Sequence, residues 1–321
     1  MDIVNIANEI RRAWTDSAPL TATCIVMLGA FLAACVGILV DDRIITGVPA
    51  WLKPAKFGIS TAIFAGTVAW LYRYITVWPR FMRAIGWLLA AVLIIEVAII
   101  DIQAARGTTS HFNNATPLDS TLFRIMGTAI GLLLLGSIAV LVALFRQKFA
   151  DAEWGWWLRL GMLITVIGAA AGGFMLGPTS EQMETIRAGQ RPLAVGGHTV
   201  GAPDGGPGIA GVGWSSEHGD LCIPHFFGLH AAQILPFLGW LTRRGRHVAQ
   251  SGRRAGLAFA VAASYIAFIG ILTWQALQGQ SIVNPDGGIM LAFGLWAVAT
   301  ASAILVLRSA PMPAHLLTTS K

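Results

Sequence analysis

The sequence predicts an all-α integral membrane protein, a bundle of eight transmembrane helices. Of the 321 residues, 55% are hydrophobic and only 12% are charged, and the mean hydropathy is +0.66. Soluble domains carry about 25% charged residues, so this composition is typical of a membrane protein. In addition, the apolar residues fall into eight runs, each close to the roughly 20 residues that a spanning helix needs.

The eight apolar runs follow one another along the chain, so we predict a single membrane domain over residues 1–321. The predicted helices cover residues 20–40, 55–77, 84–104, 121–145, 156–177, 223–242, 255–277 and 287–307. The first run is longer than the apolar part of a cleaved leader peptide, so we interpret it as an uncleaved helix. The longest polar loop, 178–222, is rich in glycine and proline and predicts an ordered outer cap made of turns.

The basic residues predict the orientation of these helices. They gather in alternate loops, at Arg11, Arg12, Arg73, Arg80, Arg83, Arg146, Lys148, Arg243, Arg244, Arg246, Arg253, Arg254, Arg308 and Lys321. By the positive-inside rule these loops are cytoplasmic, which places both termini inside the bacterial inner membrane. Because the net charge of +6 belongs to these loops, it does not indicate a nucleic-acid partner. The lipid bilayer is the predicted partner.

Two similar stretches suggest an internal repeat. Residues Pro54-Ala55-Lys56-Phe57-Gly58 open the second predicted helix, and Pro224-His225-Phe226-Phe227-Gly228 open the sixth. Two parallel four-helix halves, 1–150 and 151–321, would place these stretches in equivalent positions. The alternative is that both prolines simply occupy the usual first turn of a helix.

Histidines concentrate on the predicted outer side, at His111, His198, His218, His225 and His230. Histidine is the commonest metal ligand and carries protons near neutral pH. We therefore predict a metal site among His111, His198, His225 and His230, or a haem or other cofactor held by His111, His225 and His230. The spacing of these residues matches no short metal motif. The alternative is that they cap helices and bond to the backbone.

Acidic residues inside membrane helices are costly, and this makes them functional candidates. Glu96 and Asp101 lie in the third predicted helix, so we predict that they act with His230 as catalytic or proton-carrying groups. The alternative is a structural role, with Glu96 bonded to a neighbouring helix and Asp101 paired with Arg106 or Lys56.

Two lysines break the charge pattern on the outer side. Lys53 and Lys56 stand at the start of the second predicted helix, where the helix N-terminus also favours anions. We predict an anionic or lipid-like substrate held by Lys53 and Lys56 together with Arg106 and Gln233. The alternative is that the lysines reach toward lipid headgroups.

The chain resembles a group of polytopic bacterial membrane proteins. The resemblance rests on the segments Trp51–Phe57, Arg106–Asn113 and Pro224–His230, and it extends over nearly every predicted helix. It implies a multi-pass protein of the inner membrane and implies no particular reaction. Heme A synthase is similar in architecture only, since it also has eight helices in two halves.

Three functions are compatible with these features. We favour a membrane-embedded enzyme or redox protein whose metal or haem site opens to the outer, periplasmic face. The second is a proton-coupled permease that uses Glu96, Asp101 and His230, although the inner halves of the helices lack further acids or bases. The third is a non-catalytic sensor or assembly subunit whose outer loop binds a partner through Trp214. The cysteines, Cys24, Cys35 and Cys222, imply no disulfide framework.

Overall fold

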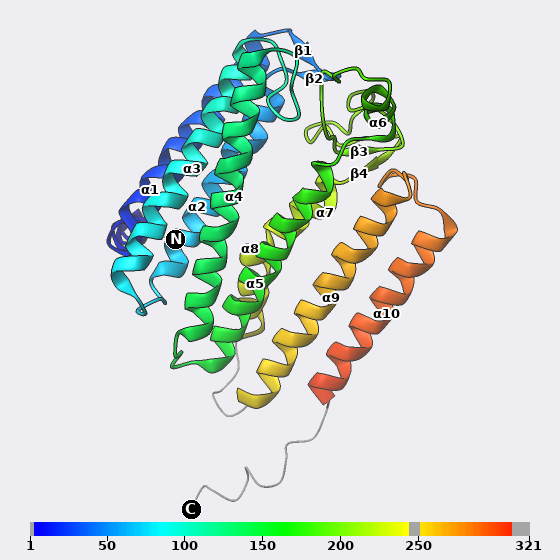
Figure 1. Ribbon diagram of the computed structural model, residues 1–321. Helices are drawn as coiled ribbons and strands as arrows, with labels where there is room; N and C mark the ends of the chain where they lie inside the picture. Colours follow the sequence, from blue (N-terminus) through cyan, green and yellow to red (C-terminus); the bar gives the residue numbers. More distant parts are fainter. Residues whose placement is uncertain (1–2, 244–250, 310–321) are drawn as a thin grey trace, which may run out of the picture.

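The computed structural model describes residues 3–243 and 251–309, and most of them are helical (Figure 1). The helices are α1 (Ile3–Val40), α2 (Leu52–Tyr72), α3 (Pro79–Ala105), α4 (Pro117–Arg146), α5 (Ala152–Ala171), the 3-10 turn η1 (Gly172–Met175), α6 (Ser180–Arg187), α7 (Cys222–Leu229), α8 (Ala231–Arg243), α9 (Ser251–Leu277) and α10 (Gly287–Ser309). Two small antiparallel sheets pair β1 (Ile44–Ile45) with β2 (Val48–Pro49) and β3 (Thr199–Val200) with β4 (Gly219–Asp220). The predicted all-α class is confirmed.

Six helices in the described ranges are long and apolar enough to cross a membrane. They are Asn8–Val40, Pro79–Ala105, Pro117–Arg146, Ala152–Met175, Ala255–Leu277 and Gly287–Leu307. Their outward faces carry large apolar side chains such as Leu39, which is 82% exposed. By length and composition the chain is therefore a multi-pass membrane protein in contact with lipid.

The other two predicted spans have different properties. Helix α2 coincides with the predicted segment 55–77, but it is less apolar because it carries Lys56, Ser60, Thr61 and Thr67. The predicted segment 223–242 contains two short helices, α7 and α8. The count of eight spans and the positions of the termini stay predictions. Arg244, Arg246 and residues 310–321, which contribute to the orientation prediction, lie outside the described residues.

The prediction of one continuous helix over 223–242 is wrong, because the helix is interrupted at His230 (φ −89°, ψ 5°). The cause is the contact with α5, where a Cβ atom at Gly168 would lie 2.4 Å from the Cα of Gly228. Beside this contact, the Thr165 hydroxyl donates to the carbonyl of Leu229 (3.3 Å) and accepts from the amide of Ala232 (2.9 Å). Thr165 thus satisfies backbone groups that the interruption leaves free.

Helix α1 is longer than the predicted segment 20–40 and contains a kink. Ser17 has extended backbone angles (φ −158°, ψ 93°), and Pro19 follows it. Proline lacks an amide hydrogen and clashes with the preceding turn, so the helix cannot continue straight. The Thr21 hydroxyl donates to the carbonyl of Ala13 across the kink (2.9 Å).

The helices pack in two groups joined along α4 and α5 (Figure 1). Helices α1–α4 contact one another, as do α5 and α7–α10. The main cluster of buried side chains nevertheless includes Leu20, Leu89 and Leu144 from the first group and Leu158 and Met162 from the second. The core is therefore continuous, and the internal repeat stays a prediction.

Residues 178–222 form a cap over one end of the helices, as Figure 1 shows. The cap contains helix α6, which begins with a capping box between Thr179 and Gln182, and the β3–β4 pair. A β-bridge joins Ala194 to Asn113 of the α3–α4 loop. The Ser281 hydroxyl of the α9–α10 loop donates to the carbonyl of Ser215. The cap is thus attached to both groups of helices.

Candidate functional site

A cavity of about 530 Å³ lies beneath the cap, between the two groups of helices. This size is within the usual range for small-molecule sites. Eight of the predicted site residues line it: Lys53, Lys56, Glu96, His111, His198, His225, His230 and Gln233. Cys222, which was not among the predicted site residues, also lines the cavity. Residues that are far apart in the chain thus share one cavity.

Lys53 and Lys56 enter the cavity from the first turn of α2. The Lys56 ammonium donates to the carbonyl of Val212 in the cap, and the Lys53 ammonium lies 5.9 Å from the centre of the Phe57 ring. Among the described residues, no carboxylate lies within 4.0 Å of either ammonium. Two cations without a carboxylate partner form a suitable site for an anion.

Glu96 and His111 form a close pair at the centre of the cavity wall. His111 Nε2 lies 3.3 Å from a carboxylate oxygen of Glu96, whose residue is 4% exposed. The contact lacks hydrogen-bond geometry, so among the described residues the buried Glu96 oxygens have no hydrogen-bond partner. His111 Nδ1 lies 3.1 Å from the Ser110 hydroxyl. An imidazole held between a hydroxyl and a carboxylate can accept and release a proton.

The pKa of His111 lies well below its ordinary value of 6.5, first because burial disfavours the charged ring. Positive charge on Lys53, His198 and His225 lowers it further. His111 is therefore neutral at pH 7.

This shift predicts a pH dependence of stability. Below about pH 6.5 the unfolded chain protonates His111 while the folded chain does not, so the contribution of this group is complete above that pH and is lost as the pH falls. We expect the melting temperature of the wild type to decrease between about pH 7 and about pH 5, and His111→Gln to reduce that decrease. His218→Gln, in the cap, is the control. Equal pH slopes for the wild type and His111→Gln would contradict the prediction.

His198, Asp220 and Cys222 form a second polar group, of which His198 and Cys222 line the cavity. Their ligand atoms all lie within 4.8 Å of one another. The β3–β4 pairing places Thr199 opposite Asp220, which brings His198 Nδ1 to 3.2 Å from the carboxylate. The same carboxylate accepts the amide hydrogens of Ser215 (3.0 Å) and Cys222 (2.8 Å). These bonds hold Asp220 in place independently of His198.

The charge on His198 depends on these neighbours. Burial disfavours its protonation, but the interactions with Cys222 and Asp220 outweigh burial and raise its pKa to about 11. A metal ion bound by the three residues would displace this proton. Histidine, carboxylate and thiolate together are ligands typical of zinc.

The remaining histidines are held separately. His225 Nδ1 lies 2.7 Å from the carbonyl of Gly168, to which it donates, and His230 Nε2 lies 3.4 Å from the Ser60 hydroxyl. The four predicted metal-binding histidines therefore share the cavity. Within the described residues, however, the set of three clustered ligand atoms is His198, Asp220 and Cys222.

No protein family, curated protein or solved structure matches this chain. The function proposed for the chain therefore rests on the geometry of the site.

Asp101 and Arg106 are not among the residues that line the cavity. The Arg106 guanidinium contacts Asp119 at 2.7 Å and also donates to Gln103. Asp119 in turn accepts the hydroxyl of Thr116, the residue that caps α4 (2.6 Å). This network joins the end of α3 to the start of α4, which is a structural arrangement.

Proposed function

We propose that the chain is a metal-dependent enzyme of the bacterial inner membrane, with eight spans, both termini cytoplasmic and a site that opens to the periplasmic face. The observation that carries the proposal is the shared cavity. Its lining combines two lysines that have no carboxylate partner among the described residues, the pair of His111 with the buried Glu96, and two of the three clustered metal-ligand residues, His198 and Cys222. Cavities that gather groups of these three kinds are typical of catalytic sites.

The residues suit metal-assisted hydrolysis of an anionic ester. A zinc ion on His198, Asp220 and Cys222 would lower the pKa of a bound water molecule. Lys53 and Lys56 would bind the anionic group of the substrate. The proton released by the attacking water would pass to the His111–Glu96 pair and from there to the leaving alcohol. Water and ester are thereby converted to an acid and an alcohol.

The proposal is tested on the detergent-purified protein by elemental analysis, an absorption spectrum and phosphate release from hexadecyl phosphate. We expect near-stoichiometric zinc, no Soret band and turnover that Glu96→Gln lowers by at least about 100-fold, within the range for general acid–base catalysis. The zinc content of Glu96→Gln should equal that of the wild type. A Soret band would favour a haem protein, whereas metal-free protein without turnover would contradict the proposal.

A proton-coupled permease is the second candidate, favoured by the interruption between α7 and α8. Interrupted helices are common at the substrate sites of transporters, and His230 stands at this one. In that case Glu96→Gln would uncouple substrate flux from a pH gradient in liposomes.

Trp214 is the predicted partner-binding residue of the third function, a sensor or assembly subunit. Its ring centre lies 5.5 Å from that of Phe226, and it lines the cavity.

A further inference from the structure

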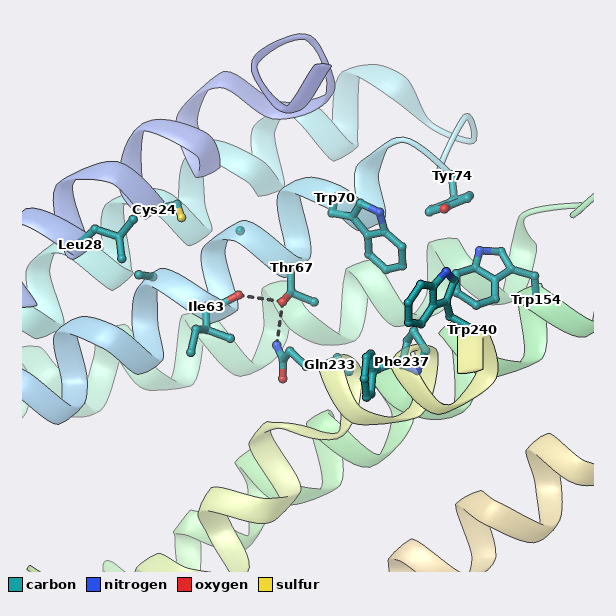
Figure 2. A pocket seen from close by; sticks show the side chains of 14 residues that line it. Cys24, Leu28, Ile63, Thr67, Trp70, Tyr74, Trp154, Gln233, Phe237 and Trp240 are labelled. Carbon is teal, nitrogen blue, oxygen red and sulfur yellow. Dashed lines mark hydrogen bonds between the residues drawn. The ribbon is translucent and has the colours of Figure 1, made fainter. Parts of the chain in front are cut away.

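A second hollow opens on the side of the helix bundle, between α1 and α2 on one side and α8 on the other (Figure 2). We call this hollow of about 620 Å³ the lateral groove. Its walls include the apolar side chains of Leu28, Ile63 and Phe237, which are 41%, 41% and 56% exposed. Because the groove adjoins α1, which is long and apolar enough to span a membrane, we expect these exposed side chains to face the hydrocarbon region of the bilayer.

The lateral groove adjoins the cavity beneath the cap, which we call the outer cavity. Gln233 lines both. The Gln233 amide donates to the hydroxyl of Thr67 (2.9 Å), and that hydroxyl donates to the carbonyl of Ile63 (2.7 Å), as Figure 2 shows. The Gln233 carbonyl oxygen is buried and has no hydrogen-bond partner among the described residues. Gln233 thus places a polar side chain, held by α2, where the two hollows adjoin.

The two hollows together have the length of a lipid chain. Lys56 marks the polar end, and Thr67 lies eleven residues further along α2, about 16 Å away at 1.5 Å per residue. Beyond Thr67, the groove is lined by Trp70 and Trp240, which Figure 2 shows, and by Tyr74 and Trp154. If a headgroup bound at Lys53 and Lys56, its hydrocarbon chain could extend about 16 Å along α2, from Lys56 to Thr67.

We infer that the substrate is an amphiphile with one long hydrocarbon chain and a phosphate headgroup. The headgroup binds Lys53 and Lys56 in the outer cavity, and the chain passes Gln233 into the lateral groove. Charge complementarity selects an anion, and the apolar walls of the lateral groove, which include Leu28, Ile63 and Phe237, suit a hydrocarbon chain. Continuity of the groove with the bilayer lets the chain arrive from the side. The inference rests on the proposed function only for the position of the headgroup.

The test uses hexadecyl phosphate that carries a photoreactive diazirine at mid-chain. We expect cross-links to peptides of α2 and α8 that line the groove. Ile63→Trp, which fills the groove, should weaken binding about tenfold, equivalent to about 1.4 kcal/mol. Ile94→Trp on α3 is the matched control, because Ile94 is also 41% exposed but does not line the groove. Lys53→Gln should weaken binding of both hexadecyl phosphate and inorganic phosphate.

The outcomes separate this inference from the proposed enzyme. Cross-links outside the groove, or equal binding by Ile63→Trp and Ile94→Trp, would overturn the lipid-chain inference while zinc content and phosphate binding stood. If the wild type showed no zinc-dependent turnover but gave the expected cross-links, the proposed enzyme would be overturned and the amphiphile site would stand. Binding of hexadecanol as tight as that of hexadecyl phosphate would overturn the assignment of the headgroup.

Discussion

Gly168→Ala is expected to prevent most of the protein from folding. The added Cβ atom would lie 2.4 Å from backbone atoms of Gly228, and no rotation of a side chain can relieve a contact between two backbones. Inserting a methyl group into a well-packed core costs about 1–3 kcal/mol, and we expect a value at or above the upper end because both partners are fixed. The separation of α5 from α7 would also disturb the bonds of Thr165.

The measurement is the yield and melting temperature of the monodisperse protein in detergent. Gly270→Ala in α9 is the matched control, since nothing lies within 4 Å of the position of its Cβ atom. That control should be neutral or slightly stabilising, because glycine within a helix costs roughly 0.5–1 kcal/mol relative to alanine. Similar melting temperatures for Gly168→Ala and Gly270→Ala would show that the α5–α7 contact is less close than described.

Cys222→Ser is expected to abolish zinc binding at the proposed site almost completely. The change replaces a thiolate ligand by a hydroxyl that remains protonated and binds zinc poorly. Changes in residues around a ligand typically lower metal affinity roughly 10–100-fold, so loss of a ligand should lower it further. Asp220 should remain in place, because the amide of Ser215 binds one of its oxygens.

The readouts are zinc per chain and, after cobalt substitution, the thiolate–cobalt absorption band. Cys35→Ser in α1 is the control, because Cys35 is not among the residues that line the cavity. We expect the band to persist in Cys35→Ser and to disappear in Cys222→Ser. If zinc content is the same in both variants, His198 and Asp220 form an ion pair beside the Cys222 thiol, and the three residues are not a metal site.

Much of the architecture was predictable because membrane helices are apolar over their whole length. Each predicted segment overlaps helical structure, although the segment 223–242 is interrupted at His230, and the glycine-rich loop forms a cap. The grouping of Lys53, Glu96 and the histidines was also predictable, because they lie near the same end of their helices. An ionisable side chain at that depth in a membrane almost always faces the interior of the helix bundle or a water-filled cavity.

Other features depend on contacts that sequence spacing does not encode. The interruption at His230 arises from Gly168 and Thr165 on another helix, so the apolar run itself gives no sign of it. Cys222 lies beside His198 only because β3 pairs with β4. The helical period places Gln103 near the face of Glu96, but it does not reveal that Gln103 bonds to Asp119.

The attachment of the cap has a mechanical consequence. Lys56 ties it to α2, and Ser281 ties it to the α9–α10 loop, so both groups of helices are fastened at the same end. At the opposite end, residues 147–151 connect α4 to α5, and the Arg159 side chain donates to the carbonyls of Leu144 and Gln147. The two groups of helices are therefore joined at both ends, and we expect the molecule to resist a spreading motion of one group away from the other.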